Sequence, residues 1–151
     1  MNTIKLQTSF QINQSAEELF PLFGPEGEKI WMPGWDYENI MGSTDLHEDY
    51  IFMAAGHNPW STKEIWLVKK FEPASYFVQC YKVVPFDAVS IVTIQCKPIT
   101  AASTEVEITN EFFGLSEKGD GFVKGRTAEG FETFMDNWRV WLEGYFEAKP
   151  A

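Results

Sequence analysis

Apolar and polar residues alternate along much of the chain up to Phe113, which is the pattern of β-strands with one buried face. The first strand is predicted at Thr3–Ile12, where most even-numbered positions are apolar. Further strands are predicted at Tyr37–Met41, Tyr50–Ala55, Ser61–Phe71, Ser75–Val84, Ala88–Lys97 and Ser103–Phe113. Most of the connections between them are short turns, so the strands are expected to form an antiparallel meander.

Two short helices are predicted after the first strand. Ser15 and Glu18 have the spacing of a capping box, which starts a helix that continues through Leu19–Phe23. Pro21 should kink or split this helix because its ring removes a backbone donor. A second helical turn is expected at Glu26–Ile30.

One long helix is predicted at Asp120–Ala148, with Asp120 as N-cap and Pro150 beyond its end. Its apolar residues fall at steps of one, three and four, on one broad face: Phe131, Phe134, Met135, Trp138, Trp141, Leu142, Tyr145 and Phe146. Three glycines lie in its first half: Gly121, Gly125 and Gly130. They would let its first half bend, approach the sheet closely, or act as a gate to a cavity.

These elements predict an α+β fold in which a curved antiparallel sheet wraps around the long C-terminal helix. The chain has 151 residues and shows no repeat or linker, so a single domain over residues 1–151 is expected. A domain of this size buries about 70% of its unfolded surface, which allows a substantial core. Aromatic residues make up 16% of the chain, enough to line a cavity as well as fill one.

Charge and cysteine content narrow the function. The net charge is −10 and no basic stripe is present, which argues against nucleic acid or an anionic membrane as partner. No apolar run approaches the ~18 residues of a membrane span, and the first residues lack a secretory signal, so no integral membrane association is expected. Cys80 and Cys96 should lie about four residues out of register, beyond disulfide reach, which indicates free thiols in a reducing cytoplasm.

The element order and several local segments resemble the START-like, or polyketide cyclase and dehydrase, superfamily (SRPBCC), whose fold is called helix-grip. The segments are Phe20–Phe23, Glu26–Glu28, Trp31–Trp35, Glu64–Val68 and Leu115–Gly119. The resemblance spans nearly the whole chain and implies a cavity between the sheet and the C-terminal helix. Members of the superfamily include lipid and steroid carriers, hormone-binding proteins, polyketide cyclases and chaperone regulators, so the fold does not fix the activity.

Candidate ligand-binding residues are aromatic or polar side chains expected on that cavity: Trp31, Trp35, Trp66, Asn110, Phe112, Phe131, Met135 and Trp138. Asn110 shares the parity of the apolar residues of its strand, so it is expected on the buried face with a neighbouring group, water or ligand as hydrogen-bond partner. Trp31 and Trp35 either wall the cavity entrance or pack within a turn.

Candidate acids and bases are few. Asp36 would hydrogen-bond a polar ligand group or pair with backbone amides. Both faces of strand 61–71 carry apolar residues, so Glu64 is either a buried acid beside Trp66 or an exposed partner of a lysine. His57 is a loop acid or an ordinary turn residue. With only His47 and His57 present, neither a metal site nor a cofactor is expected.

Three functions are compatible with these observations. The first is a protein that binds a small apolar or aromatic molecule, such as a lipid, steroid or polyketide. The second is a cyclase, dehydratase or hydrolase that uses one buried acid or base. The third is a protein-interaction module similar to chaperone regulators, with a filled interior and an exposed apolar patch. A monomer and a homodimer both remain possible.

Overall fold

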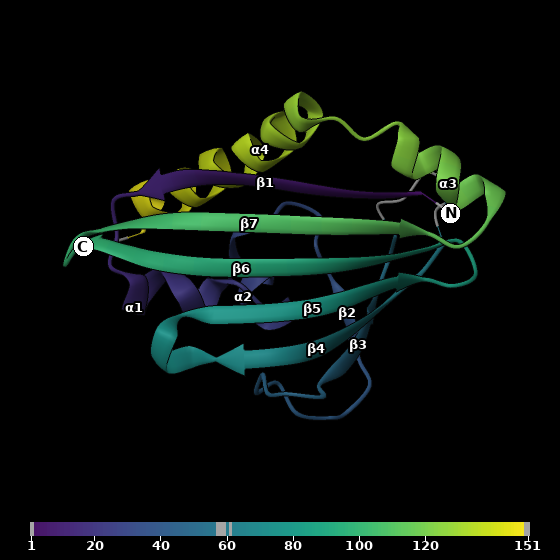
Figure 1. Cartoon of the computed structure of the whole chain (residues 1–151). Coiled ribbons are helices and arrows are strands. Elements are labelled where there is room, and N and C mark those ends of the chain that lie inside the picture. Colours follow the sequence, from purple (N-terminus) through teal and green to yellow (C-terminus); the bar gives the residue numbers. More distant parts are fainter. Residues whose placement is uncertain (1, 57–59, 61, 150–151) are drawn as a thin grey trace.

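The computed structural model describes residues 2–56, 60 and 62–149 (Figure 1). Seven strands form one antiparallel sheet in the order β1-β7-β6-β5-β4-β3-β2. The strands are β1 Thr3–Ile12, β2 Tyr37–Asn39, β3 Ile51–Ala54, β4 Glu64–Glu72, β5 Phe77–Val84, β6 Ala88–Thr100 and β7 Ser103–Gly114. The predicted meander is confirmed, with β1 added at its far edge by pairing with β7.

The first helices follow the local signals of the sequence. The Ser15 Oγ accepts a hydrogen bond from the Glu18 backbone N–H, which caps α1 (Ala16–Leu19). The split at Pro21 is confirmed, because the chain continues as a 3₁₀ turn at Phe20–Leu22 and α2 begins only at Pro25. Helix α2 spans Pro25–Trp31, and a second 3₁₀ turn at Pro73–Ser75 joins β4 to β5.

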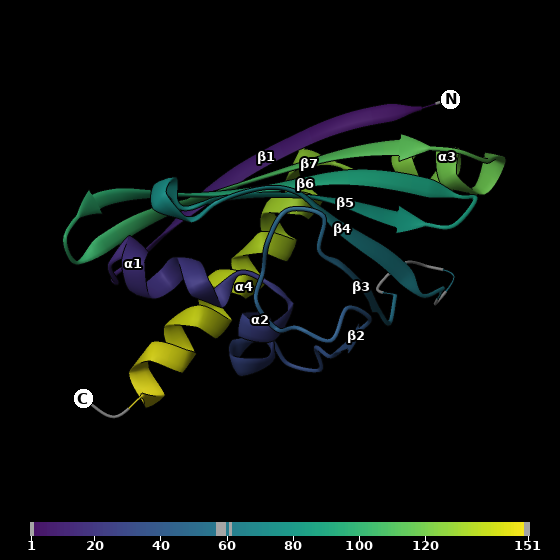
Figure 2. The same cartoon turned by 90° about the horizontal axis from the view of Figure 1, so that it is seen from below.

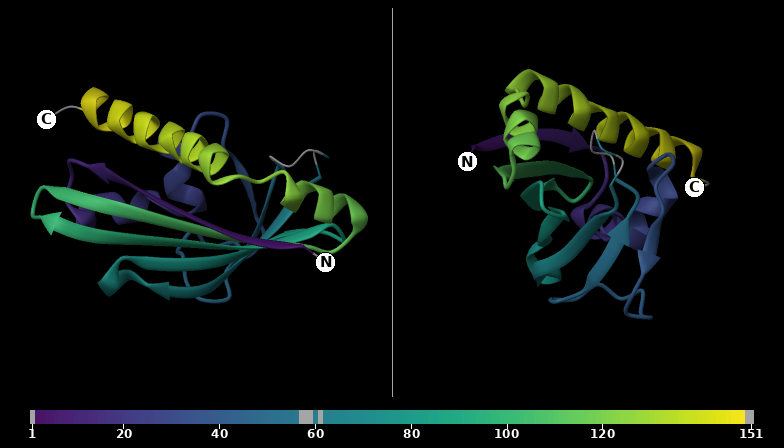
Figure 3. Two further views of the ribbon diagram at one scale, coloured as in Figure 1. Left: turned by 45° about the horizontal axis from the view of Figure 1, so that its top comes forward. Right: turned by 90° about the vertical axis from the view of Figure 1, so that its right-hand side faces the viewer.

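The prediction of one helix at Asp120–Ala148 is wrong. Two helices are present, α3 (Glu117–Lys124) and α4 (Ala128–Ala148), which the left view of Figure 3 shows as separate coils joined by a short link. Each has its own N-cap: the Ser116 Oγ accepts from the Gly119 N–H, and the Thr127 Oγ1 accepts from the Gly130 N–H, both at 3.0 Å. The second cap ends helical continuity because the cap residue is extended.

Helix α3 packs tightly against the β5–β6 turn and the start of the chain. Asp120, expected as an N-cap, lies within α3, and its Oδ1 accepts a hydrogen bond from the Asn2 backbone N–H at 2.8 Å. Gly119 is required at this contact, because a Cβ there would lie 1.7 Å from the Asp87 carbonyl oxygen. Helix α3 is therefore held against this end of the sheet.

Helices α1, α2 and α4 all lie on one side of the curved sheet, as Figure 2 shows. Helix α4 buries one face against it: Phe131, Met135, Trp138 and Leu142. The inner face of β7 contributes Val106, Ile108 and Phe112, which confirms the parity expected from the sequence. The core therefore sits between this face of the sheet and the three helices.

Strand β4 changes parity in the middle, which the sequence did not indicate. Trp66 and Val68 face inward, and the ladder between β4 and β5 shifts register between Val68 and Lys70. As a result Lys70 is exposed, whereas Phe71 turns inward and stacks on Phe20 with ring centroids 6.0 Å apart. Strict alternation would place Lys70 on the face of Trp66, but the bulge moves one residue to the other face.

The remaining predictions on register hold. Cys80 pairs with Val92 and both cysteines are free, so the predicted offset from Cys96 is confirmed. Several strand ends differ by a few residues, as at β2, which ends at Asn39 instead of Met41. No helix in the described part of the chain is long and apolar enough to cross a membrane.

Candidate functional site

Two cavities lie on the inner side of the sheet. The first, here called the Glu28 cavity, has a volume of about 60 Å³ and lies between α2, α4 and strands β3–β6. Its lining is apolar except for one carboxyl and one thiol: Phe23, Gly24, Pro25, Glu28, Leu46, Phe52, Trp66, Val68, Val78, Cys80, Val92, Ile94 and Trp138. A polar group of a molecule in it would therefore meet Glu28, Cys80 or the indole N–H of Trp66.

Glu28 is directed into this cavity by the geometry of α2. It lies three residues after Pro25 and three before Trp31, both buried, so all three side chains share one helix face. Burial raises the pKa of the Glu28 carboxyl from 4.5 to about 8, although an opposing hydrogen bond with the Gly24 backbone lowers it. At neutral pH Glu28 is therefore largely protonated and can donate a proton.

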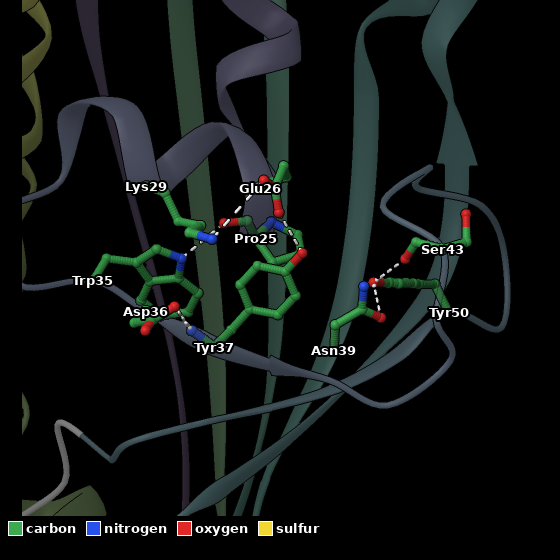
Figure 4. A network of polar contacts seen from close by, with 9 residues as sticks. All are labelled: Pro25, Glu26, Lys29, Trp35, Asp36, Tyr37, Asn39, Ser43 and Tyr50. Atoms are coloured by element: carbon green, nitrogen blue, oxygen red, sulfur yellow. Dashed lines mark hydrogen bonds and ion pairs between the residues drawn. The ribbon is translucent and has the colours of Figure 1, made fainter.

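A set of polar contacts anchors α2 over the sheet (Figure 4). The Trp35 Nε1–H donates to the Pro25 carbonyl oxygen at 2.9 Å, and the Tyr37 hydroxyl donates to Glu26. Lys29 adds an ion pair to this set, with its Nζ 3.9 Å from the Glu26 Oε1. Because these bonds join the first turn of α2 to β2 and to the segment just before it, they fix the helix that carries Glu28.

The second cavity, here called the Lys82 cavity, has a volume of about 270 Å³ and lies between the sheet and the α3–α4 link. Its lining comes from β1, β5 and β7 on one side and from the two helices and their link on the other: Leu6, Lys82, Asn110, Phe112, Phe122, Gly125, Arg126, Thr127, Gly130, Phe131 and Phe134. It combines aromatic walls with two cationic side chains. Two of the three glycines noted in the sequence line it.

Lys82 forms an ion pair on the inner face of the sheet. Its Nζ lies 3.7 Å from the Glu64 Oε2, and the Glu64 side chain is only 1% exposed. The same ammonium lies 5.7 Å from the ring centroid of Trp66, its neighbour across the strands. Glu64 therefore combines features of both interpretations from the sequence: it is buried, and it is paired with a lysine.

Two buried polar atoms have no hydrogen-bond partner among the described residues: Trp66 Nε1 and Asn110 Oδ1. Trp66 lines the Glu28 cavity and Asn110 lines the Lys82 cavity. A buried polar group without a partner costs about 1–3 kcal/mol, so proteins keep few of them. Each atom can therefore form one further hydrogen bond, the Trp66 Nε1 as donor and the Asn110 Oδ1 as acceptor.

The predicted ligand-binding residues fall into two groups. Five line a cavity: Trp66 and Trp138 the Glu28 cavity, and Asn110, Phe112 and Phe131 the Lys82 cavity. The other three line neither of these cavities: Trp31, Trp35 and Met135.

Those three support the cavity walls. Trp31 packs edge-on against Phe23 and Trp138, and its Nε1–H donates to the Leu22 carbonyl oxygen. Trp35 contacts Trp66 edge-on, at 6.5 Å between ring centroids. Met135 is buried in the core. Trp31 and Trp35 thus pack against aromatic residues that line the Glu28 cavity.

The catalytic candidates from the sequence are dispersed. Asp36 is exposed, and its Oδ1 accepts a hydrogen bond from the Tyr37 backbone N–H at 2.8 Å. His57 lies outside the described residues. Glu64 alone is buried near a cavity. Within the part of the chain that the structure describes, no group of three His, Cys, Asp or Glu side chains is placed to hold a metal ion.

Sequence reasoning missed Glu28, Lys82 and Arg126. Signals for two of them were present: Glu28 shares the face of Pro25 and Trp31 on its helix, and Lys82 shares the inward parity of its strand with Val78 and Val84. Arg126 lies in the helix break that the sequence did not predict. Periodicity therefore finds polar groups on apolar faces, provided that the element itself is predicted correctly.

The chain is similar to several solved structures along almost all its length. Norcoclaurine synthase from Thalictrum flavum, in complex with dopamine and hydroxybenzaldehyde, matches 99% of this chain and 90% of its own, with 12% identity and a TM-score of 0.68. Ara h 8.0201 matches 98% and 100%, with 9% identity and a TM-score of 0.70. The di-domain ARO/CYC protein BexL of the BE-7585A biosynthetic pathway matches 97% of this chain and 47% of its own, with 14% identity and a TM-score of 0.67.

These likenesses establish the fold. The chain has the same helix-grip fold as these structures, so the fold expected from the resemblance in the sequence is confirmed. The chain spans about half the length of BexL, which has two domains. No family model and no curated protein matches the sequence. Activity therefore has to be argued from the cavities themselves.

Proposed function

We propose that the protein binds a small apolar or aromatic molecule between the sheet and the α3–α4 segment. The Lys82 cavity carries this proposal, because aromatic and apolar side chains surround about 270 Å³ there and polar groups converge on it from two sides. Burying apolar ligand surface contributes roughly 25 cal/mol per Å², so micromolar affinity needs few polar contacts. The fold is one in which norcoclaurine synthase holds two small aromatic compounds.

Analysis of the purified protein tests this function directly. We expect a stoichiometric apolar or aromatic compound in the solvent extract of protein that was denatured after purification, detected by mass spectrometry. If the protein purifies empty, naphthalene-based probes should instead change its intrinsic fluorescence, because the aromatic lining reports on the interior. A clean extract together with no binding of any probe in a lipid and aromatic panel would contradict the proposal.

A matched pair of variants localises the binding. Asn110→Phe places a larger side chain in the Lys82 cavity, whereas Thr109→Phe places the same side chain on the opposite face of β7. We expect Asn110→Phe to lower ligand occupancy or probe affinity at least tenfold and Thr109→Phe to leave it unchanged. Equal losses in both variants would place the binding elsewhere or show a general loss of structure.

Glu28 favours a second candidate function, a cyclase- or dehydratase-type enzyme. A carboxylic acid with a pKa of about 8 in an apolar cavity can donate a proton at neutral pH or, once ionised, accept one from a carbon next to a carbonyl group. The ARO/CYC protein and norcoclaurine synthase share the fold. Glu28 replaces Glu64, Asp36 and His57 as the residue on which we base this function.

Proton abstraction can be measured without knowing the substrate. In D₂O, a small ketone such as acetone, whose size matches the cavity, should exchange its α-protons faster in the presence of the protein, as followed by NMR, with a rate that rises through pH 8. We expect Glu28→Gln to abolish the acceleration and Glu17→Gln, an exposed control on α1, to preserve it. Exchange at the same rate with and without protein would leave ligand binding as the sole function.

The third function considered from the sequence, a protein-interaction module, predicts a filled interior, and the two cavities argue against it. The exposed large apolar residues of the described chain are distributed over several elements: Ile30, Ile40, Met41, Phe86, Ile99, Leu115, Phe134 and Val140. Both free thiols fit the reducing cytoplasm expected from the sequence. We therefore favour a small molecule over a protein as the partner.

A further inference from the structure

The charge of the Lys82 cavity is opposite to that of the whole protein. The chain has 22 acidic and 12 basic residues and a net charge of −10. Among the described residues that line this cavity, however, two are cationic, Lys82 and Arg126, and none is acidic. An anion that is repelled by most of the surface would therefore meet attractive charge at this opening.

The two cations occupy different depths. Lys82 comes from the inner face of β5, where its side chain is 22% exposed and its Nζ lies 3.7 Å from the Glu64 Oε2. Arg126 is exposed in the α3–α4 link, with its guanidinium carbon 4.4 Å from the ring centroid of Phe122. Stacking on Phe122 orients the guanidinium at the cavity, so one charge lies at the rim and one at the floor.

Asn110 adds a neutral polar group on the floor of the cavity. Its Oδ1 is buried without a partner, and the amide offers a donor as well as an acceptor. The rest of the lining is apolar and mainly aromatic, including Phe112, Phe131 and Phe134. A ligand that matches the two cations and the apolar walls has an apolar, preferably aromatic, body and one small anionic group. That group accepts hydrogen bonds from the cations and from the Asn110 Nδ2, whereas the Asn110 Oδ1 is an acceptor and is satisfied only by a donor.

We propose that the Lys82 cavity selects small aromatic or apolar carboxylic acids in their anionic form, with the carboxylate held between Arg126 and Lys82. This inference rests on the proposed ligand-binding function and specifies its ligand class. Arg126 attracts the anion and supplies planar N–H donors that match a carboxylate. Lys82 binds the deeper oxygen and remains beside Glu64, and the Asn110 Nδ2 donates from β7, two strands away from β5.

The test compares two probes of the same shape. Naphthalene-2-carboxylate and naphthalene-2-carboxamide differ by the charge of one group, so isothermal titration calorimetry with both isolates the contribution of that charge. For the wild-type protein at low ionic strength, we expect the carboxylate to bind at least tenfold more tightly than the carboxamide. The preference should shrink in high salt, because screening weakens the attraction.

Variants assign the preference to the cavity. Arg126→Gln should lower carboxylate affinity about tenfold and leave carboxamide affinity unchanged. Lys124→Gln removes a charge only two residues earlier, from an exposed position outside the cavity lining, and should change neither affinity. Because Lys82→Met alone would leave Glu64 buried without its lysine, the double variant Lys82→Met/Glu64→Gln is used. It should also lose the preference while retaining carboxamide binding.

The outcomes separate this inference from the proposed function. Equal wild-type affinities for both probes would overturn the selection of acids and leave apolar binding intact. Equal losses in Arg126→Gln and Lys124→Gln would also overturn it, because they would assign the preference to general surface charge. If neither probe binds and no member of the lipid and aromatic panel binds, the proposed function fails together with the inference. Loss of the preference in Arg126→Gln and in the double variant, but not in Lys124→Gln, supports it.

Discussion

The two cavities lie on the same face of one sheet, and they differ in whether their ionisable side chain has a partner of opposite charge. Glu28 enters its cavity from a helix and meets apolar side chains, with no lysine or arginine of the described chain paired to it. Lys82 enters its cavity from a strand and has Glu64 as a partner on the next strand. Both groups are polar residues at positions of apolar periodicity.

The difference shows how surroundings decide what a buried polar residue can do. Without a cationic partner, burial favours the uncharged form of Glu28, so its carboxyl becomes a weak acid suited to proton transfer. A salt-bridge partner on the sheet holds Lys82 in place, where its ammonium contributes to binding an anion. We therefore expect chemistry to depend on the Glu28 cavity and ligand selection to depend on the Lys82 cavity.

The largest expected effect is on the pH dependence of stability through Glu28. Its carboxyl titrates near 4.5 when unfolded and at about 8 when folded, so between these pH values the folded state holds more protons than the unfolded state. The free energy of unfolding should therefore fall as the pH rises from about 4.5 to about 8, by up to roughly 5 kcal/mol. Urea unfolding at pH 5 and pH 8.5 measures this change.

Glu28→Gln should remove this contribution. The variant is expected to equal the wild type in stability at pH 5 and to exceed it at pH 8.5, because glutamine stays neutral. Glu132→Gln, an exposed change on α4, controls for the loss of a carboxyl and should follow the wild type at both pH values. If Glu28→Gln and wild type change in parallel with pH, the Glu28 carboxyl is hydrated and not held in an apolar environment.

The next prediction is a smaller change in the free energy of unfolding, caused by substitution of Asn110. Asn110→Leu replaces an amide whose buried Oδ1 has no partner by an apolar side chain of similar size, so the free energy of unfolding should rise by roughly 1 kcal/mol. The same change should lower affinity for naphthalene-2-carboxylate, which shows that the amide serves binding at a cost in stability. Thr109→Val on the opposite face serves as control. A less stable Asn110→Leu variant would indicate that the amide already has a partner in the empty protein.

Much of the fold was predictable because strand parity and caps are local. The alternation at β1 and β7, the capping residue Ser15 and the interruption at Pro21 each appear in the structure as expected. The break between α3 and α4 was missed, because the apolar stripe from Phe131 onward is continuous and masked the cap at Thr127. The sequence pattern favoured one helix, whereas the N-caps Ser116 and Thr127 each begin a separate helix.

The candidate site was predicted only in part, for a different reason. Asn110 was found because it is a polar residue at a position that shares the parity of the apolar residues in a well-predicted strand. The face of Trp66 was left open, because both faces of its strand carry apolar residues, and the bulge after Val68 gave no signal in the sequence. Arg126 joins the cavity only through the tertiary position of the helix break. Local periodicity therefore indicates which face of an element a residue lies on, whereas a cavity depends on how elements far apart in the sequence pack together.

The smallest expected effect compares the two thiols. Burial raises the pKa of both Cys80 and Cys96 to about 12, so at pH 8 only about one thiol in 10,000 is ionised and both should react slowly with a thiol reagent. Cys80 has a second cause, the negative charge of nearby Glu28 once that group ionises. At pH 9 Glu28→Gln should therefore speed labelling of Cys80 a few-fold and leave the labelling rate of Cys96 unchanged.

Peptide mapping by mass spectrometry measures the labelling of the two thiols separately, with Cys96 as the internal control. Equal acceleration at both sites would mean that the substitution loosens the whole fold, whereas no change at Cys80 would mean that the Glu28 carboxylate points away from β5.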